Sequence, residues 1–116
     1  MTKITLKGRV PSKKNSKIMV CRGKTPMLLP SAKYTEWHKD AMLQLKGVGI
    51  IDKNILFLTF YPPDKRPADL SNKTESIMDL LVDAGLIEDD NWYVIKKLVL
   101  SFGEVDKENP RCEIEY

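Results

Sequence analysis

A short acidic segment in the second half of the chain holds the residues best suited to bind a metal ion. Seven acidic residues and one basic residue fall between Asp69 and Asp90, whereas residues 1–68 hold fourteen Lys/Arg and four Asp/Glu. Crowded carboxylates repel one another unless a cation lies among them. Oxygen ligands suit Mg²⁺ or Mn²⁺, and a single histidine, His38, excludes a histidine-rich zinc site. A carboxylate cluster within a basic chain predicts a metal-dependent nuclease.

The spacing of three polar residues predicts that they share one face of a helix. The helix is predicted at about residues 71–84, where apolar side chains recur at helical intervals. Asn72, Glu75 and Asp79 are at positions i, i+3 and i+7 of this segment. Residues at these spacings project from the same side of a helix, so Glu75 and Asp79 are candidates for one metal site.

Three further carboxylates flank this predicted helix. Asp69 lies just before its first turn, and Asp89 and Asp90 follow its end, where a return of the chain would bring them beside it. A metal ion held by this set would lower the pKa of a bound water and stabilise the charge that develops on a cleaved phosphodiester. The predicted metal ligands are Asp69, Glu75, Asp79, Asp89 and Asp90, and all of these except Asp89 are also predicted catalytic residues.

The same residues have a purely structural alternative. Asp69, Ser71 or Asn72 could cap the helix, and Glu75 could complete a capping box with Asn72. Carboxylates near a helix N-terminus are also favoured by the helix dipole. Spacing alone therefore leaves the metal site and the helix cap open as interpretations.

Cationic residues gather in a loop near the N-terminus and just before the acidic segment. Neutralisation of phosphates by Lys and Arg dominates DNA affinity and makes it depend on salt. Lys65 and Arg66 would lie at the scissile phosphate if Asp69 holds the metal, and could stabilise its transition state. The alternative for the lysines is an ordinary solvated side chain. The predicted DNA-binding residues are Lys13, Lys14, Lys17, Lys65, Arg66 and Lys73.

The hydrophobic pattern predicts the elements that hold these residues. Alternating or continuous apolar runs predict strands at residues 3–10, 18–21, 27–29, 55–61, 93–102 and 111–116. Ser31 is the predicted N-cap of a first helix that ends at Gly47 and Gly49, and Gly85 is predicted to end the second helix. These elements predict one α+β domain over residues 1–116, with about two helices packed on one mixed β-sheet.

Composition and length restrict the class of protein. A chain of 116 residues is long enough for one hydrophobic core. No apolar run approaches the roughly 18–20 residues of a membrane span, so we expect no membrane partner. The N-terminus lacks the apolar segment of a signal peptide, which predicts cytoplasmic localisation. Cys21 and Cys112 show no CxxC spacing and are predicted to be thiols in a reducing compartment.

The order of motifs in the acidic segment resembles one family. RPADLSN at residues 66–72, followed by DLLVDAGLIEDD at residues 79–90, is similar to the core of the RusA family of Holliday-junction resolvases. GRVPSKKN at residues 8–15 resembles that family's N-terminal strand and loop. The resemblance implies a RusA-like fold and a Mg²⁺- or Mn²⁺-dependent endodeoxyribonuclease that cuts four-way junctions in recombination and repair. It also implies a homodimer, since two symmetric strand breaks need two active sites.

The resemblance also implies roles for individual positions. Asp69 and Asp90 match the first and last aspartates of the family and would be metal ligands. Asp79 matches the aspartate of the family's helix, and Asn72 matches an asparagine near its start.

Two departures from the family pattern leave the activity open. The second family aspartate falls on Ser71, and a functionally important lysine falls on Glu75. Glu75 could restore a carboxylate one turn along, while Lys73 stays close enough to touch phosphate. Two alternatives remain: a DNA- or partner-binding homologue with weakened or lost catalysis, which Ser71 favours, and a nuclease that prefers flaps or replication forks.

Overall fold

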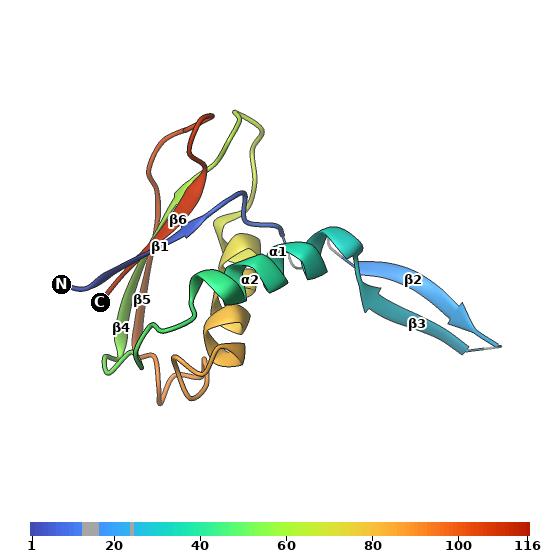
Figure 1. Ribbon diagram of the computed structural model, residues 1–116, viewed down its shortest axis with the longest axis horizontal. Coiled ribbons are helices and arrows are strands. Elements are labelled where there is room, and N and C mark those ends of the chain that lie inside the picture. Colours follow the sequence, from blue (N-terminus) through green and yellow to red (C-terminus); the bar gives the residue numbers. More distant parts are fainter. Residues whose placement is uncertain (13–16, 24) are drawn as a thin grey trace.

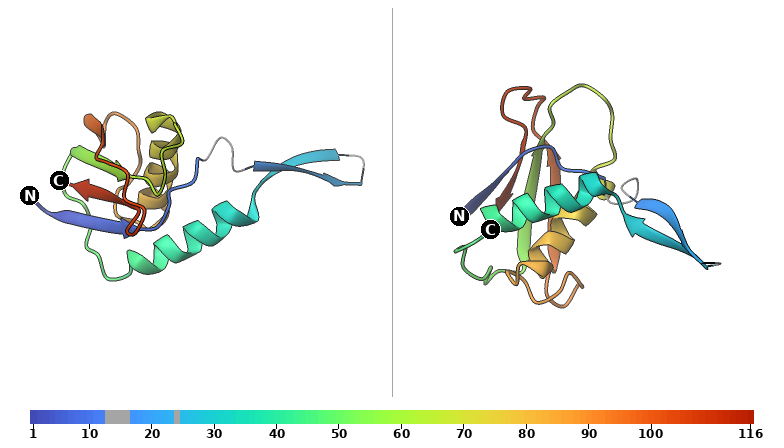
Figure 2. Two further views of the ribbon diagram at one scale, coloured as in Figure 1. Left: turned by 90° about the horizontal axis from the view of Figure 1, so that it is seen from above. Right: turned by 45° about the vertical axis from the view of Figure 1, so that its right-hand side comes forward.

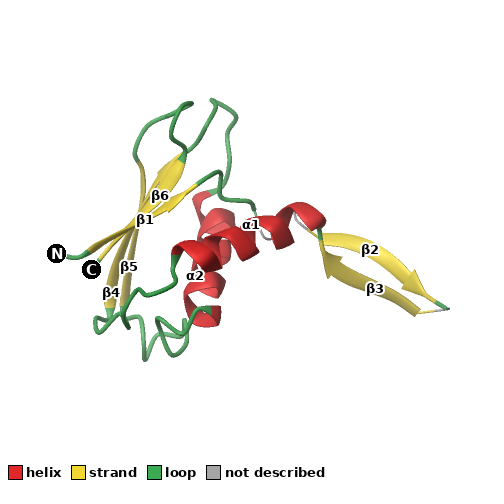
Figure 3. Ribbon diagram, in the orientation of Figure 1, coloured by secondary structure: helices red, strands yellow, loops and turns green. Residues whose placement is uncertain are grey.

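The structure is a computed structural model that describes residues 1–12, 17–23 and 25–116, and of residues 17–22 and 25–30 it describes the backbone only. Within this part of the chain, two helices pack on one face of a mixed four-stranded sheet (Figures 1 and 3). In spatial order the sheet consists of β1 (Lys3–Lys7), β6 (Arg111–Glu115), β4 (Ile55–Tyr61) and β5 (Lys97–Phe102). The predicted α+β fold is confirmed.

The crossover from β4 to β5 builds the core of the domain. These two strands are parallel, and helix α2 (Leu70–Asp83) connects them, as parallel neighbours require. Alternation along β4 buries Leu56, Leu58 and Phe60 against the helical layer, and the predicted strand at residues 55–61 is confirmed. β4 is antiparallel to β6, which in turn is antiparallel to β1.

Helix α2 ends at the glycine that the sequence predicts. Gly85 has a φ of 72°, a left-handed conformation that glycine adopts without steric cost. The amide of Leu86 donates to the carbonyl of Leu81 at 3.0 Å, and the amide of Gly85 donates to that of Val82 at 3.0 Å. This pair of bonds is a Schellman motif, which satisfies carbonyls left free at the helix end.

Helix α1 (Ala32–Gln44) packs beside α2 and against β1 on the same face of the sheet. Ser31 is its N-cap as predicted, and its Oγ accepts a hydrogen bond from the Tyr34 amide at 3.2 Å. The helix ends at Gln44, before the predicted glycines, and the Gln44 side chain exchanges two hydrogen bonds with the backbone of Lys7. His38 Nε2 lies 2.8 Å from Asp83 Oδ2, which ties α1 to the last turn of α2.

A β-hairpin projects from the body of the protein. It consists of β2 (Lys17–Arg22) and β3 (Thr25–Pro30), which pair with each other in antiparallel register. Figures 1 and 2 show it extending beyond the N-terminus of α1, away from the sheet. The predicted hairpin is confirmed, with each strand longer than its apolar run.

Two predicted strands are too long by more than one residue. The strand predicted at residues 3–10 ends at Lys7, because Gly8 follows with a φ of 107° and leaves the extended conformation. The apolar run at residues 93–102 forms strand only from Lys97, because Asn91 organises a turn ahead of it. The side-chain oxygen of Asn91 accepts from the Tyr93 amide at 2.9 Å, and the backbone carbonyl of Asn91 accepts from the Ile95 amide at 2.9 Å. Asparagine commonly replaces strand pairing with such local bonds.

Neither helix in the described residues has the length and apolarity needed to cross a membrane.

Candidate nucleic-acid interface

The N-terminus of α2 presents a carboxylate that does not cap the helix. Asp69 occupies the N-cap position, but its side chain accepts no hydrogen bond from the amides of the first turn. It is exposed and accepts from the side-chain amide of Asn72 at 3.3 Å. The capping interpretation therefore does not explain the Asp69 carboxylate, which is left facing solvent beside the loop at residues 62–68.

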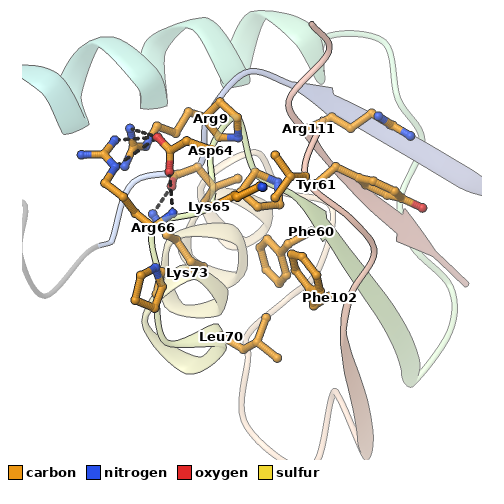
Figure 4. A pocket seen from close by; sticks show the side chains of 16 residues that line it. Arg9, Phe60, Tyr61, Asp64, Lys65, Arg66, Leu70, Lys73, Phe102 and Arg111 are labelled. Atoms are coloured by element: carbon orange, nitrogen blue, oxygen red, sulfur yellow. Dashed lines mark hydrogen bonds and ion pairs between the residues drawn. The ribbon is translucent and has the colours of Figure 1, made fainter. Parts of the chain in front are cut away.

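Two arginines converge on one carboxylate, that of Asp64, in the loop before α2 (Figure 4). Arg66 donates from Nη2 to Asp64 Oδ2 at 2.8 Å and from its backbone amide to Oδ1 at 3.1 Å. Arg9, which follows β1, lies 3.5 Å from the same Oδ2 through its Nη1. The Arg66 hydrogen bonds lower the pKa of Asp64 to about 2, so this carboxylate stays ionised and holds both guanidinium groups in place.

Lys73 adds a third cation, and its environment is unusual. Its ammonium is half-buried and donates to the carbonyl of Val10 at 2.6 Å. Burial lowers the pKa of Lys73, and the positive charges of Arg9 and Arg66 lower it further. No carboxylate among the described residues lies within ion-pair distance of it. We call Arg9, Arg66 and Lys73 the cationic cluster, and its positive charge exceeds what Asp64 can neutralise.

Two hollows flank the cationic cluster, and all three of its residues line both of them. The polar hollow, of about 740 Å³, extends to α1 and includes Asp69, Asn72, Lys33 and Glu36. The apolar pocket, of about 290 Å³, extends to the ends of β4 and β5. A DNA backbone whose phosphates cross the cationic cluster would have the Asp69 carboxylate of the polar hollow on one side and the apolar pocket on the other.

The structure does not bring the five predicted metal ligands together within one chain. Asp69 follows the end of β4, whereas Asp89 and Asp90 lie in the loop before β5, beside the start of β4. Two backbone hydrogen bonds tie that loop to the start of β4, from the Ile51 amide to the Leu86 carbonyl at 2.8 Å and from Lys96 to Asn54 at 2.7 Å. Figure 1 shows the two regions at opposite ends of α2.

The remaining carboxylates are also spread along the helix. Glu75 is exposed in the second turn of α2, and Asp79 is half-buried one turn further on. Asp89 accepts from the Asp90 amide and the Asn91 side chain, each at 2.8 Å, and these bonds lower the pKa of Asp89. Among the described residues, no three Asp, Glu, His or Cys side chains are close enough to form a metal cluster.

A metal shared with a substrate fits the polar hollow better than a metal held by protein alone. Asp69 lines this hollow from α2, and Glu36 lines it from α1. Mg²⁺ is commonly bound by one or two carboxylates together with waters and substrate phosphates. These two carboxylates therefore suit an ion whose ligands are completed by a bound phosphate.

The predicted DNA-binding residues fall into two groups. Lys65, Arg66 and Lys73 line the apolar pocket, and Arg66 and Lys73 also line the polar hollow. Lys13 and Lys14 lie outside the described residues, and the side chain of Lys17 is not among those described.

Sequence reasoning missed several residues of this site. Asp64 stands in the basic half of the chain, and its spacing of two from Arg66 is the only signal of its anchoring role. Glu36 and Phe102 reach the site from distant segments, and nothing in the local sequence marks them.

Comparison with known proteins adds no family assignment. No protein-family model matches the chain, and no curated protein matches it. The function must therefore be inferred from the geometry of the site and from the resemblance carried by residues 66–90.

Proposed function

We propose that this protein is a metal-dependent endodeoxyribonuclease that cuts branched DNA, with four-way junctions as its principal substrate. The observation that carries the proposal is the position of Asp69, an exposed carboxylate that shares a hollow with the whole cationic cluster. Cations at this place neutralise phosphate, and a carboxylate beside a bound phosphate supplies a ligand for Mg²⁺ or Mn²⁺. The substrate class comes from the resemblance to the RusA family.

The chain's own residues have separate tasks in this proposal. Asp64 orients Arg66 toward the incoming phosphate, and the Val10 carbonyl holds the Lys73 ammonium beside it. Asp69, with Asn72 fixing its side chain, would hold the metal together with a phosphate oxygen. When bound, the metal would activate a water and stabilise negative charge on the phosphodiester. Recognition of the junction would depend on shape and charge, because the contacts proposed here are to the DNA backbone.

A homodimer is part of the proposal and would reunite the separated carboxylates. α2 has 14 residues, so its ends are roughly 20 Å apart at about 1.5 Å per residue. If two chains pack with their α2 helices antiparallel about a two-fold axis, Asp69 of one chain faces the loop of Asp89 and Asp90 of the other. Each active site would then draw carboxylates from both chains.

Mixed dimers test this shared site. Asp69→Asn and Asp90→Asn homodimers should both be inactive. Co-refolding the two variants should restore nicking, because the mixed dimer keeps one site with both aspartates and loses both from the other. A plasmid carrying a cruciform should then be nicked but not linearised. Mixed dimers that stay inactive would contradict the shared site and place each metal within one chain.

A panel of labelled DNA substrates tests the proposed activity. The unaltered protein should cut a synthetic four-way junction only with Mg²⁺ or Mn²⁺, and Asp69→Asn should abolish cutting. Asp40→Asn is the matched control, since Asp40 is also exposed but lies on α1 and lines neither hollow. Tight binding without cleavage under either metal would support the DNA-binding alternative that Ser71 favours. Faster cleavage of flaps or forks would support the alternative substrate preference.

A further inference from the structure

The apolar pocket beside the cationic cluster has aromatic walls that are only partly covered. Phe60, at the end of β4, is 6% exposed, whereas Phe102, at the end of β5, is 60% exposed. Figure 4 shows the two rings next to each other, with Leu70 of α2 nearby. Val105, which also lines the pocket, is 37% exposed. Burying such apolar surface is favourable, so the pocket would gain from a flat apolar occupant.

The rim of this pocket is strongly positive. Five cationic residues and a single acidic residue, Asp64, line it. Arg111 is neutralised by ion pairs of 2.8 Å to Asp106 and to Glu113 and stacks on Tyr61. The other four cations have only Asp64 as a carboxylate partner among the described residues. An occupant should therefore be anionic as well as flat and apolar.

We propose that the apolar pocket receives one unpaired nucleotide of the DNA, with its base against Phe102 and its phosphate on Arg66 and Lys73. A nucleotide combines an aromatic face with a phosphate, as the walls and the rim require. The volume of about 290 Å³ lies just below the roughly 300–1,000 Å³ of small-molecule sites, which suits an occupant as small as one base. This inference rests on the proposed function, because branched DNA is the source of bases that leave the stack.

The state of Lys73 supports the phosphate half of this inference. Its ammonium is half-buried beside two guanidinium groups, and its pKa is lowered by burial and by their charges. A phosphate bound between Lys73 and Arg66 would supply the missing negative charge. A base within a duplex cannot reach the pocket, so the site would select DNA in which a nucleotide is already unpaired or easily extruded.

The test compares DNA with and without a base at one unpaired position. The ligands are a labelled duplex with a single bulged thymidine, the same duplex with an abasic residue in the bulge, and a four-way junction. Dissociation constants are measured by fluorescence anisotropy in EDTA, so that cleavage plays no part. The unaltered protein should bind the thymidine bulge roughly 5- to 150-fold more tightly than the abasic bulge, the range expected for stacking of one base.

Substitutions at Phe102 locate the preference. Phe102→Ala should remove most of the difference between the two bulges, and Phe102→Leu, which keeps apolar volume without the flat ring, should restore little of it. Leu43→Ala is the matched control, because Leu43 is 64% exposed, lies in the last turn of α1 and lines neither the apolar pocket nor the polar hollow, and this variant should behave as the unaltered protein. Thermal melting checks that each variant folds.

Two outcomes would overturn the inference, and they are distinguishable from failure of the proposed function. Equal affinity of the unaltered protein for the two bulges would overturn it, as would an unchanged preference in Phe102→Ala. If the four-way junction still binds tightly in either case, the nucleotide pocket is wrong and the proposed function is unaffected. If no branched DNA binds, both are wrong.

Discussion

Replacing Lys73 with methionine should separate a phosphate-binding role from a structural one. Methionine keeps much of the apolar stem of lysine and removes the charge. The variant loses the hydrogen bond from the Lys73 ammonium to the Val10 carbonyl, and hydrogen bonds of charged groups contribute about 1.5–3 kcal/mol to stability. The variant also loses the half-buried ammonium of Lys73, which Arg9 and Arg66 repel and whose burial costs free energy. These terms oppose each other, so we expect the melting temperature to change by only a few degrees.

The effect on DNA binding should be clear in its salt dependence. Each phosphate contact contributes about 0.9 to the slope of log affinity against log salt on duplex DNA. Between 50 and 200 mM KCl, the unaltered protein should therefore lose about 3.5-fold more affinity for a four-way junction than Lys73→Met does. Lys46→Met is the control, because Lys46 is exposed, follows α1 and lines neither the apolar pocket nor the polar hollow.

The refuting result is equally specific. If Lys73→Met binds the junction with an unchanged affinity and salt slope, Lys73 does not contact phosphate. A large fall in melting temperature together with unchanged binding would show that Lys73 mainly ties the segment around Val10 to α2.

Three further predictions concern stability and reactivity. Hydrogen bonds from Arg111 and Lys3 lower the pKa of Glu113 from 4.5, so the ionised Glu113 stabilises the fold fully above about pH 4.5, and this stabilisation is lost as the pH falls through the lowered pKa. The melting temperature of Glu113→Gln should therefore fall less between pH 5 and pH 3 than that of the unaltered protein. An equal fall would contradict this. Burial raises the pKa of Cys112 to about 12, so its thiol should react with a thiol reagent such as Ellman's reagent only after unfolding, and rapid reaction in the folded protein would be contrary evidence. A Cβ at Gly103 would lie 2.5 Å from the Tyr61 ring, so Gly103→Ala should destabilise the fold by about 1–3 kcal/mol in urea unfolding, and an unchanged midpoint would show that the ring moves freely.

Local signals predicted the elements on which the site is built. The apolar alternation at residues 55–61 corresponds to β4. Ser31 and Gly85 mark helix ends, and these ends could be predicted because each residue acts only on the backbone of its near neighbours in the chain. The start of β5 was misplaced because the Asn91 side chain takes amides that the apolar pattern assigned to a strand. This competition between a side chain and a neighbouring strand for backbone amides depends on hydrogen bonding, so a hydropathy pattern does not reveal it.

The arrangement of the carboxylates could not be read from spacing. Leu86 and Ile87 are buried, and the Leu86 carbonyl is bonded to Ile51, so the chain after α2 stays at the start of β4 instead of returning along the helix. That long-range contact decides where Asp89 and Asp90 lie. The role of Asp64 was missed for a similar reason, since Arg9 reaches it only through the fold.

The most direct test of the central claim is the single-turnover rate of four-way junction cleavage by the unaltered protein and by Asp69→Asn. We predict paired nicks that require Mg²⁺ or Mn²⁺, and a rate at least about 100-fold lower in the variant, since even indirect partners of metal ligands cost about 10- to 100-fold. Cleavage that proceeds equally in Asp69→Asn, or no cleavage by the unaltered protein with either metal, would contradict the claim that this carboxylate beside the cationic cluster is the centre of a nuclease.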